Sequence, residues 1–240
     1  MAPQTRRSPR RTEALSRERI VETAVELLDA AGEDGLTFKT LTERLATGPG
    51  AIYWHVANKG ELLDAATDAV VTAALEIEPS GSPSEVEPRI RAVALGLFTA
   101  IERHPWLATQ LATQLSRSPS GSVTPRIFES IGRQVRALGV PEGNWFTATS
   151  ALMHYILGAA GQHAANIASV RALGSDADRA RFLDAASSAW EDLDPDEYPF
   201  TRAVANQVRG HDDREQFLAG VDLVLAGISA LHTHPHTPVV

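Results

Sequence analysis

The sequence predicts an all-α protein made of a small N-terminal helical unit and a larger C-terminal helical domain. Apolar residues recur at spacings of three and four along most of the chain, and no segment shows the strict alternation of a β-strand. Clusters of Pro, Gly and Ser interrupt this pattern and mark the ends of successive helices. A length of 240 residues allows two such domains, each with its own core.

The composition excludes several classes of protein. With 43% hydrophobic and 22% charged residues the chain is an ordinary globular protein, and no apolar run approaches the ~20 residues that cross a bilayer. The absence of cysteine excludes disulfides, thiolate metal sites and cysteine nucleophiles. No Gly-rich phosphate loop or metal-ligand spacing is present, so we expect no metal and no cofactor. The N-terminus also lacks the apolar core of a secretion signal, which indicates a cytoplasmic protein without a membrane partner.

The N-terminal unit begins after a basic arm. Residues 1–15 are rich in Arg, Ser and Pro without periodicity, and we expect them to be flexible. Ser16 is a helix N-cap, and the apolar residues that follow at helical spacing predict a first helix that ends at Gly32. A second helix is predicted over 38–46, with Thr37 as its N-cap.

A tight turn joins the second helix to a third. The turn is Thr47-Gly48-Pro49, because Pro is favoured at the first position of a helix, and the third helix is predicted over 49–55. Three helices, of which the last two are short and closely joined, have the lengths of a helix-turn-helix, whose third helix enters the DNA major groove. Residues 16–60 are therefore expected to bind double-stranded DNA.

The side chains around the third helix also favour a DNA interface. Phosphate contacts are predicted for Thr37, Tyr53, His55 and Lys59, and a DNA contact for Trp54. Base contacts are predicted for Lys39, Thr40, Pro49, Gly50 and Ala51, which offer few polar groups and leave much of the specificity to DNA shape. In the alternative interpretation, Tyr53 and Trp54 are core aromatics and His55 is a satisfied histidine.

The charge distribution agrees with DNA binding, although the net charge is −8. The first 60 residues hold nine of the 22 basic and eight of the 30 acidic residues, so the negative excess lies in the larger domain. Six arginines lie in the first twenty residues, and the two lysines of the chain are Lys39 and Lys59. In the alternative interpretation, the arginine arm is a solvated tail without a role.

Helical periodicity continues through the larger domain, residues 61–231. Asn58 and Glu61 resemble a capping box that opens a helix over 59–77, and 78–83 is a break. Later helices are predicted over 84–103, 105–116, 124–138, 142–169, 176–190, 200–208 and 213–231. Residues 232–240 are expected to be a disordered tail without a metal site. Binding of a divalent metal by its alternating histidines, His232, His234 and His236, is the alternative.

The segment from Leu15 to Leu63 resembles the DNA-binding domain of the TetR family of transcriptional regulators, which ends in a Tyr-x-His-Val/Phe-x-x-Lys pattern. The pattern here begins at Tyr53 and ends at Lys59, and its Tyr-Trp-His-Val block is similar to that of the tetracycline-repressor subgroup. The resemblance implies phosphate contacts by Tyr53, His55 and Lys59. The chain departs from the family at the turn, where Ala46 replaces the usual Gly and Gly48 the usual Ser, so we expect a different local backbone there.

The resemblance also implies a homodimer on a palindromic operator, an effector cavity in the larger domain, and movement of the helix 59–77 when the effector binds. Small residues enrich 142–169 and the last helix, which would let two helices of each subunit pair with their symmetry mates; ordinary packing within one chain is the alternative. Candidate cavity residues are Phe98, Trp106, Phe128, Trp145, Met153, His154, Tyr155 and His163, each of which is otherwise a core residue. His154 and His163 are the best polar candidates, although nine positions apart they fall on opposite faces of a helix.

We therefore expect a homodimeric repressor that an unknown small-molecule effector releases from its operator, and not an enzyme. One alternative is a regulator or activator that needs no effector or that depends on a co-repressor. Another is a small all-α enzyme that uses His154 or His163 with a carboxylate, but no nucleophile motif supports it.

Overall fold

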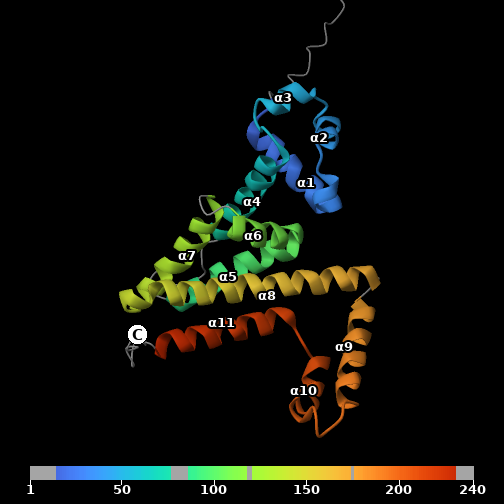
Figure 1. Ribbon diagram of the computed structural model, residues 1–240, viewed down its shortest axis with the longest axis vertical. Helices are drawn as coiled ribbons and strands as arrows, with labels where there is room; N and C mark the ends of the chain where they lie inside the picture. The colour runs from blue at the N-terminus through green and yellow to red at the C-terminus, as the bar shows by residue number, and fades with distance from the viewer. Residues whose placement is uncertain (1–14, 77–85, 118–120, 174–175, 231–240) are drawn as a thin grey trace, which may run out of the picture. The chain divides into compact units, whose positions relative to one another are not determined.

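A computed structural model describes residues 15–76, 86–117, 121–173 and 176–230, and it is all-α over these ranges, as the sequence predicts (Figure 1). Most of the predicted basic arm and the predicted histidine tail lie outside the described residues. The chain divides into two compact units that meet between Ala66 and Thr67. Among the described helices, none combines the length and the apolar character required to cross a lipid bilayer.

The first unit contains three helices and the start of a fourth. They are α1 (Arg17–Gly35), α2 (Phe38–Leu45), α3 (Pro49–Tyr53) and α4 (Lys59–Leu75), which continues into the second unit. Ser16 caps α1 by accepting a hydrogen bond from the Arg19 amide, as the sequence predicts. The core of the unit is formed by the buried apolar residues Ile20, Ala24, Leu28, Leu36, Leu41, Ile52, Val56, Leu62 and Ala66.

The backbone at two positions differs from the expectation. Gly32 breaks the helical geometry with φ of 63°, but one more turn follows, so α1 ends at Gly35. Ala46 has φ of 49° and ψ of 46°, in the left-handed region, and caps α2 with its N–H directed at the carbonyls of Thr42 and Glu43. The expected change of local backbone is therefore wrong, because Ala46 itself adopts the left-handed conformation that favours glycine.

The third helix is shorter than predicted. It ends at Tyr53, because the amides of both His55 and Val56 donate to the Ile52 carbonyl and the chain turns away from the helix there. Trp54 and His55 therefore lie in the turn between α3 and α4, not on the helix.

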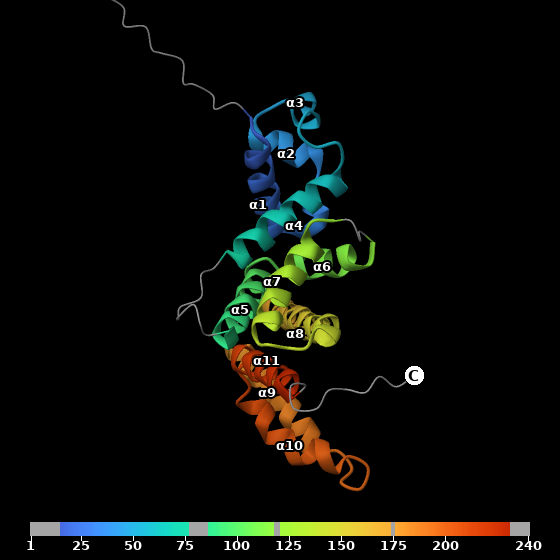
Figure 2. The same ribbon diagram turned by 90° about the vertical axis from the view of Figure 1, so that its left-hand side faces the viewer.

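The second unit is built around one long helix, α8. After α4 its elements are α5 (Val86–Arg103), α6 (Trp106–Arg117), α7 (Val123–Ala137), a 3₁₀ turn η1 (Glu142–Asn144), α8 (Trp145–Leu173), α9 (Asp176–Glu191), α10 (Pro199–Arg209) and α11 (Asp213–Ala230). Helices α5, α6, α7 and α11 all pack on α8, and α11 also packs on α5. Figures 1 and 2 show α8 and α11 side by side.

Helices α9 and α10 form a hairpin that projects from the rest of the second unit (Figures 1 and 2). We call this hairpin, residues 176–209, the α9–α10 arm. Pro199 at the first position of α10 and Gly210 just beyond its end set the limits of the returning helix. The arm touches the body through contacts of α9 with α8 and through an ion pair between Arg179 and Asp213 of α11.

Candidate functional site

The aromatic residues at the end of α3 are exposed in the first unit. The Tyr53 ring stacks on Phe38 at 4.5 Å between ring centroids, yet Tyr53 is 53% exposed. Trp54 is 90% exposed, so the interpretation of Trp54 as a core residue is wrong. An exposed tryptophan beside an exposed tyrosine is a surface that suits contact with sugar and phosphate along a DNA backbone.

The predicted base-contacting residues divide into two groups. Lys39 is exposed and only weakly paired, with its Nζ 4.0 Å from Glu43 Oε1, and Pro49 and Gly50 are exposed at the start of α3. Thr40 is different, because its Oγ1 lies 3.0 Å from the Thr37 amide and 2.9 Å from the Gly35 carbonyl. Its one proton is directed at the backbone, so Thr40 could donate a hydrogen bond to a base only by breaking the cap of α2.

Thr37 lies at the other end of the same cap. Its Oγ1 accepts a hydrogen bond from the Thr40 amide at 3.1 Å, which completes a capping box with threonine in both positions. The sequence predicts Thr37 as the N-cap but not the reciprocal partner. A Thr-x-x-Thr spacing is a weaker signal than the usual Ser/Thr-x-x-Glu/Gln.

Lys59, a predicted phosphate contact, also has a partner within the unit. Its Nζ donates to the Glu33 backbone carbonyl at 2.7 Å and lies 4.0 Å from Glu33 Oε1. The ammonium thus satisfies one of the last carbonyls of α1 while remaining partly exposed. Glu33 directly follows the break at Gly32 and was not predicted as a partner of Lys59.

Glu61 fixes the turn that carries Trp54 and His55. Its Oε2 accepts a hydrogen bond from the Ala57 amide at 2.8 Å, while Asn58 Oδ1 accepts from the Glu61 amide at 2.9 Å. The Ala57 hydrogen bond, with a further contribution from Arg17, lowers the pKa of Glu61 below its ordinary value. The capping box predicted here is therefore present with a shifted donor, because the Glu61 carboxylate accepts from the Ala57 amide rather than from the Asn58 amide.

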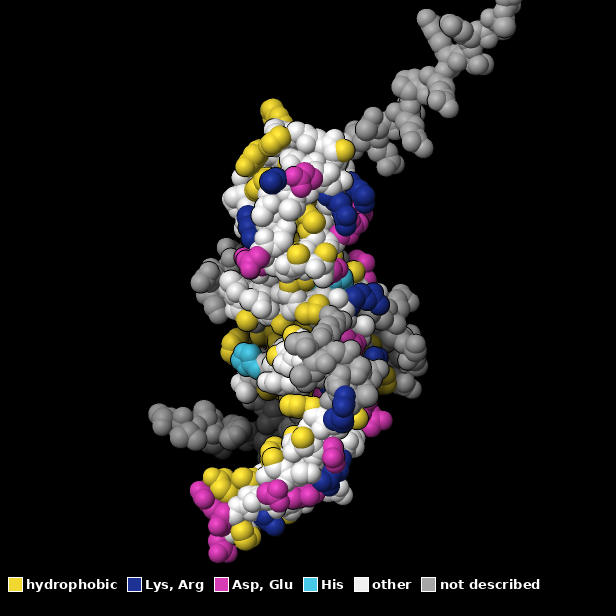
Figure 3. Space-filling model, turned by 90° about the vertical axis from the view of Figure 1, so that its right-hand side faces the viewer, with side chains coloured by type: hydrophobic (Ala, Val, Ile, Leu, Met, Phe, Trp, Pro, Cys, Tyr) yellow, Lys and Arg dark blue, Asp and Glu magenta, His cyan; other side chains and the backbone are white. Residues whose placement is uncertain are grey.

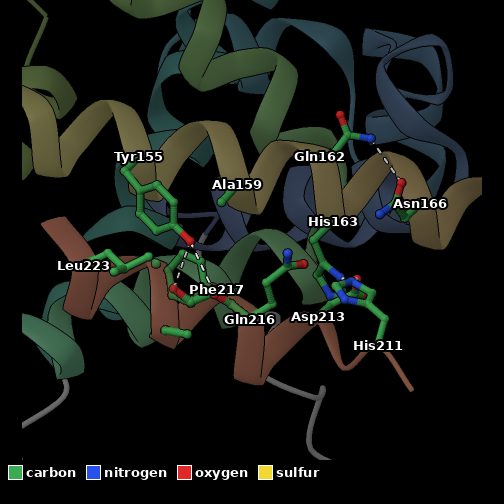
Figure 4. A pocket seen from close by; sticks show the side chains of 12 residues that line it. Tyr155, Ala159, Gln162, His163, Asn166, His211, Asp213, Gln216, Phe217 and Leu223 are labelled. Atoms are coloured by element: carbon green, nitrogen blue, oxygen red, sulfur yellow. Dashed lines mark hydrogen bonds and ion pairs between the residues drawn. The ribbon is translucent and has the colours of Figure 1, made fainter. Parts of the chain in front are cut away.

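The second unit contains an open cavity of about 460 Å³ in the groove between α8 and α11 (Figure 4). Tyr155 and Phe217 form its aromatic wall, and the Tyr155 hydroxyl donates to the Phe217 carbonyl at 3.1 Å. Burial raises the pKa of Tyr155. Gly220 lies directly against Tyr155, and any side chain at position 220 would collide with that ring.

The polar end of the cavity is built on His163. The ring of His163 is buried and stacks on Phe98 at 4.5 Å. Its Nε2 lies 3.2 Å from Glu102 Oε1, and its buried Nδ1 lies 3.0 Å from Asp213 Oδ2 without hydrogen-bond alignment. A neutral imidazole offers a single N–H, so only a protonated ring could donate to both carboxylates.

Asp213, the first residue of α11, connects this end of the cavity to the α9–α10 arm. It accepts from Arg179 at 2.6 Å and from His211 at 2.7 Å. Burial alone would raise the pKa of Asp213, but the His211 hydrogen bond and the Arg179 charge outweigh it, so the pKa is lowered. A second, smaller pocket of about 140 Å³ adjoins the cavity and shares with it Asn166, His211 and Asp213.

The predicted cavity residues do not gather at one site. Tyr155 and His163 line the cavity, and Phe98 lies behind His163. Trp106 and Met153 are buried elsewhere, and the Phe128 ring lies tilted against that of Phe146. Trp145 donates to the Val140 carbonyl, with Arg136 over its ring. His154 is exposed and lines neither pocket. Phe217, Asp213 and His211 were not predicted.

One broad surface of the second unit is rich in small exposed residues. On α8 they recur at helical spacing with two polar residues among them, and on α11 they surround Leu223, which is 75% exposed. We call this the α8–α11 face, and it consists of Ala151, His154, Gly158, Gln162, Ala165, Ala219, Leu223, Ala226 and Gly227. The cavity opens on this face, since Gln162, Ala219 and Leu223 belong to the face and also line the cavity.

Comparison with known proteins agrees with this architecture. Residues 81–232 match the model of the tetracyclin repressor-like C-terminal domain, and residues 20–66 match that of bacterial regulatory proteins of the tetR family. The two matches coincide with the larger helical unit and with the helix-turn-helix. The chain belongs to the TetR family.

Solved TetR-family structures resemble the whole chain. The transcriptional regulator SCO7222, a TetR from Streptomyces coelicolor, is 70% identical with a TM-score of 0.81 and covers 91% of this chain and 99% of its own. ActR from the same organism, in complex with actinorhodin, is 25% identical with a TM-score of 0.73, covering 91% of this chain and 97% of that one.

Curated TetR-family relatives include repressors. The HTH-type transcriptional repressor DrrR1 of Streptomyces coeruleorubidus is 31% identical over 64% of this chain, and the tetracycline repressor protein class D of Escherichia coli is 26% identical over 89% of it and 88% of that protein. The matched regions span only 55% and 59% of the first two curated relatives. The matched family is one of bacterial regulatory proteins.

Proposed function

We propose that this protein is a homodimeric repressor that binds a palindromic operator in the cytoplasm and that a small molecule releases from it. The observation that carries the proposal is the presence, in one chain, of exposed Tyr53 and Trp54 at the end of α3 and of an exposed α8–α11 face with a cavity in it. The first supports DNA binding, and the second supports both pairing of subunits and regulation.

On the DNA side, Tyr53, Trp54 and His55 act as phosphate and sugar contacts that position α3. Sequence is read by Lys39, by van der Waals contact from Pro49 and Gly50, and by DNA shape, since the start of α3 offers no polar side chain. One helix of five residues reads only a few base pairs. A two-fold dimer doubles that number on a palindrome.

On the dimer side, the α8–α11 face is the proposed interface. Its alanines and glycines allow two helices to approach closely. Leu223 is a large apolar side chain that is exposed in the single chain, which is typical of a residue that a partner covers. Two helices from each subunit would form a four-helix arrangement about the two-fold axis.

On the effector side, the cavity between α8 and α11 is the proposed site. Its aromatic wall and single polar end suit an aromatic molecule with polar substituents. ActR, whose solved complex holds actinorhodin, is a relative that supports this ligand class. Because the cavity opens on the proposed interface, a bound molecule would contact both subunits. Helix α4 runs from the first unit into the second, so it would transmit this contact and change the spacing of the two α3 helices.

The experiment that tests the proposal begins with selection of bound sequences from a random double-stranded DNA library. The selected DNA should be a palindrome, bound by two chains in fluorescence anisotropy and analytical ultracentrifugation. Addition of actinorhodin, as an aromatic probe, or of a hit from a thermal-shift screen should then weaken the complex by tenfold or more. Selection of a non-palindromic site by a monomer, or tight binding that no screened compound weakens, would contradict the proposal.

A further inference from the structure

We propose that the smaller pocket, at the base of the α9–α10 arm, is a second lobe of the effector site and takes a single uncharged sugar ring. The effector is then an aromatic glycoside, with its aromatic rings in the larger cavity and its sugar in the smaller pocket. The inference rests on the proposed effector cavity and names the chemical class of molecule that fills it.

The two pockets meet at a polar junction. Asn166, His211 and Asp213 line both of them, so one molecule that reaches past these side chains contacts both pockets. In Figure 4 the three lie at the end of the larger cavity away from Tyr155 and Leu223. A ligand that fills both pockets therefore has an apolar part on the aromatic wall and a polar part beyond the junction.

The volumes of the two pockets suit parts of different size. A cavity of about 150 Å³ holds one benzene molecule, so the smaller pocket, of about 140 Å³, has room for a single six-membered ring. By the same measure the larger cavity, of about 460 Å³, has room for about three rings. The rings of Tyr155 and Phe217, which stack at 6.0 Å between centroids, give that cavity a flat wall.

The side chains of the smaller pocket are of the kinds that bind hydroxyl groups. A sugar hydroxyl both donates and accepts hydrogen bonds. Arg179 provides donors, Asp213 provides acceptors, and the Asn166 amide provides both. Phe182, 56% exposed, adds an aromatic face on which the C–H groups of a sugar ring can pack. Figure 3 shows charged and hydrophobic side chains mixed over the surface of the arm as well, at the lower end of the view.

The charges at the junction favour an uncharged ring over an amine or an acid. The Asp213 carboxylate is paired with the Arg179 guanidinium at 2.6 Å, so a ligand ammonium would find no unpaired negative charge there. A ligand carboxylate would lie beside Asp213 and be repelled by it. The N–H groups of Asn166 have no acceptor among the described residues, whereas its Oδ1 accepts from Gln162 at 3.1 Å. A sugar hydroxyl can accept from these N–H groups without bringing a charge.

The first test compares matched probes on the full-length protein by isothermal titration calorimetry. The pairs are daidzein with its glucoside daidzin, and quercetin with its rhamnoside quercitrin. In at least one pair the glycoside should bind tenfold or more tightly than its aglycone, because its hydroxyl groups pair with polar side chains of the smaller pocket. Free glucose, which has no aromatic part, should not bind at the same concentrations. Glycosides that bind no more tightly than their aglycones in both pairs would overturn the second lobe.

The second test places the sugar. Phe182→Ala removes the aromatic face of the smaller pocket, and Phe200→Ala is the matched control, an exposed phenylalanine of the same arm that lines neither pocket. Phe182→Ala should remove most of the gain of the glycoside and leave aglycone affinity unchanged, whereas Phe200→Ala should change neither. Ala159→Phe, in the larger cavity only, should weaken aglycone and glycoside alike. A glycoside that keeps its full gain in Phe182→Ala would overturn the inference.

The outcomes separate this inference from the proposed function. If neither aglycones nor glycosides bind, the proposed effector cavity fails and the second lobe fails with it. If a glycoside binds with the expected gain but does not weaken the complex with the selected DNA, the second lobe stands and the proposed release from the operator fails.

Discussion

The ammonium of Lys59 donates a hydrogen bond to the backbone carbonyl of Glu33 at 2.7 Å, which joins the start of α4 to the end of α1. The family resemblance gives Lys59 a phosphate contact, and the structure gives it a helix-capping contact as well. The two roles are compatible, because the side chain is only partly covered and an ammonium has three donors.

Lys59→Ala is therefore expected to have two effects. Affinity should fall alike for every DNA sequence, with the salt dependence of binding reduced by about 0.9 per subunit, since one phosphate contact is lost. The first unit should also lose about 1 kcal/mol of stability with the carbonyl contact. Anisotropy titrations at several salt concentrations and urea unfolding measure the two effects.

Tyr53→Phe is the control for this pair of effects. It removes a hydroxyl but keeps the ring that stacks on Phe38, so DNA affinity should fall while the urea midpoint stays constant. If Lys59→Ala leaves both the salt slope and the affinity unchanged, Lys59 is only a helix cap and its phosphate contact is wrong.

Ala46→Gly is expected to stabilise the helix-turn-helix. An alanine in the left-handed region costs about 1–2 kcal/mol, and the greater freedom of glycine in the unfolded chain offsets part of the gain, which leaves about 0.5–1 kcal/mol. Urea unfolding should show a higher midpoint with an unchanged slope. A lower midpoint would mean that Ala46 is not strained.

The sequence predicted what local rules determine. Ser16, Thr37 and Pro49 begin their helices as expected, because capping and proline geometry depend on a few neighbouring residues. The left-handed conformation of Ala46 was not predicted, because alanine disfavours positive φ and the turn between α2 and α3 overrides that preference.

The cavity could be predicted only in part. Tyr155 and His163 were identified from an apolar helix with few polar groups, but Phe217 and Asp213 lie some 50 or more residues away and meet them only through the pairing of α8 with α11. His154 shows the limit of such reasoning. A histidine on a helix of apolar and small residues is compatible with a position in a cavity and with a position on a subunit face. The sequence does not distinguish the two, because the choice depends on which helices pack against it.

The carboxylate of Glu61 should make the first unit sensitive to acid. Its folded pKa is lowered, so its contribution to stability is present above the ordinary value of 4.5 and is lost as the pH falls through the lower folded value. Glu61→Gln should lower the melting temperature at neutral pH, and the difference from wild type should shrink well below pH 4.5. A difference that stays constant across that range would exclude the carboxylate as its cause.

Gly220→Ala tests the close contact in the wall of the cavity. The added methyl group would displace the Tyr155 ring and break its hydrogen bond to the Phe217 carbonyl, at a cost of about 1–3 kcal/mol. Gly132→Ala on α7 is the matched control, because its methyl group would meet Thr149 at ordinary contact distance and should leave stability equal or higher. Thermal unfolding of the two variants distinguishes the sites, and equal melting temperatures would show that Tyr155 moves aside freely.

Leu223→Asp places a charge at the centre of the α8–α11 face without touching the arm. Leu223 is 75% exposed in the single chain, so the change should leave the fold and the melting temperature of the monomer almost unaffected. In the proposed dimer the same position would be buried, and an unpaired carboxylate there should raise the dissociation constant by a factor of ten or more. Since two half-sites need two chains, affinity for a selected palindrome should fall in parallel. His104→Asn, between α5 and α6 and not part of this face, should change neither. If Leu223→Asp remains a dimer of wild-type affinity, the subunits pair through another surface, and the cavity that opens beside Leu223 cannot lie between them.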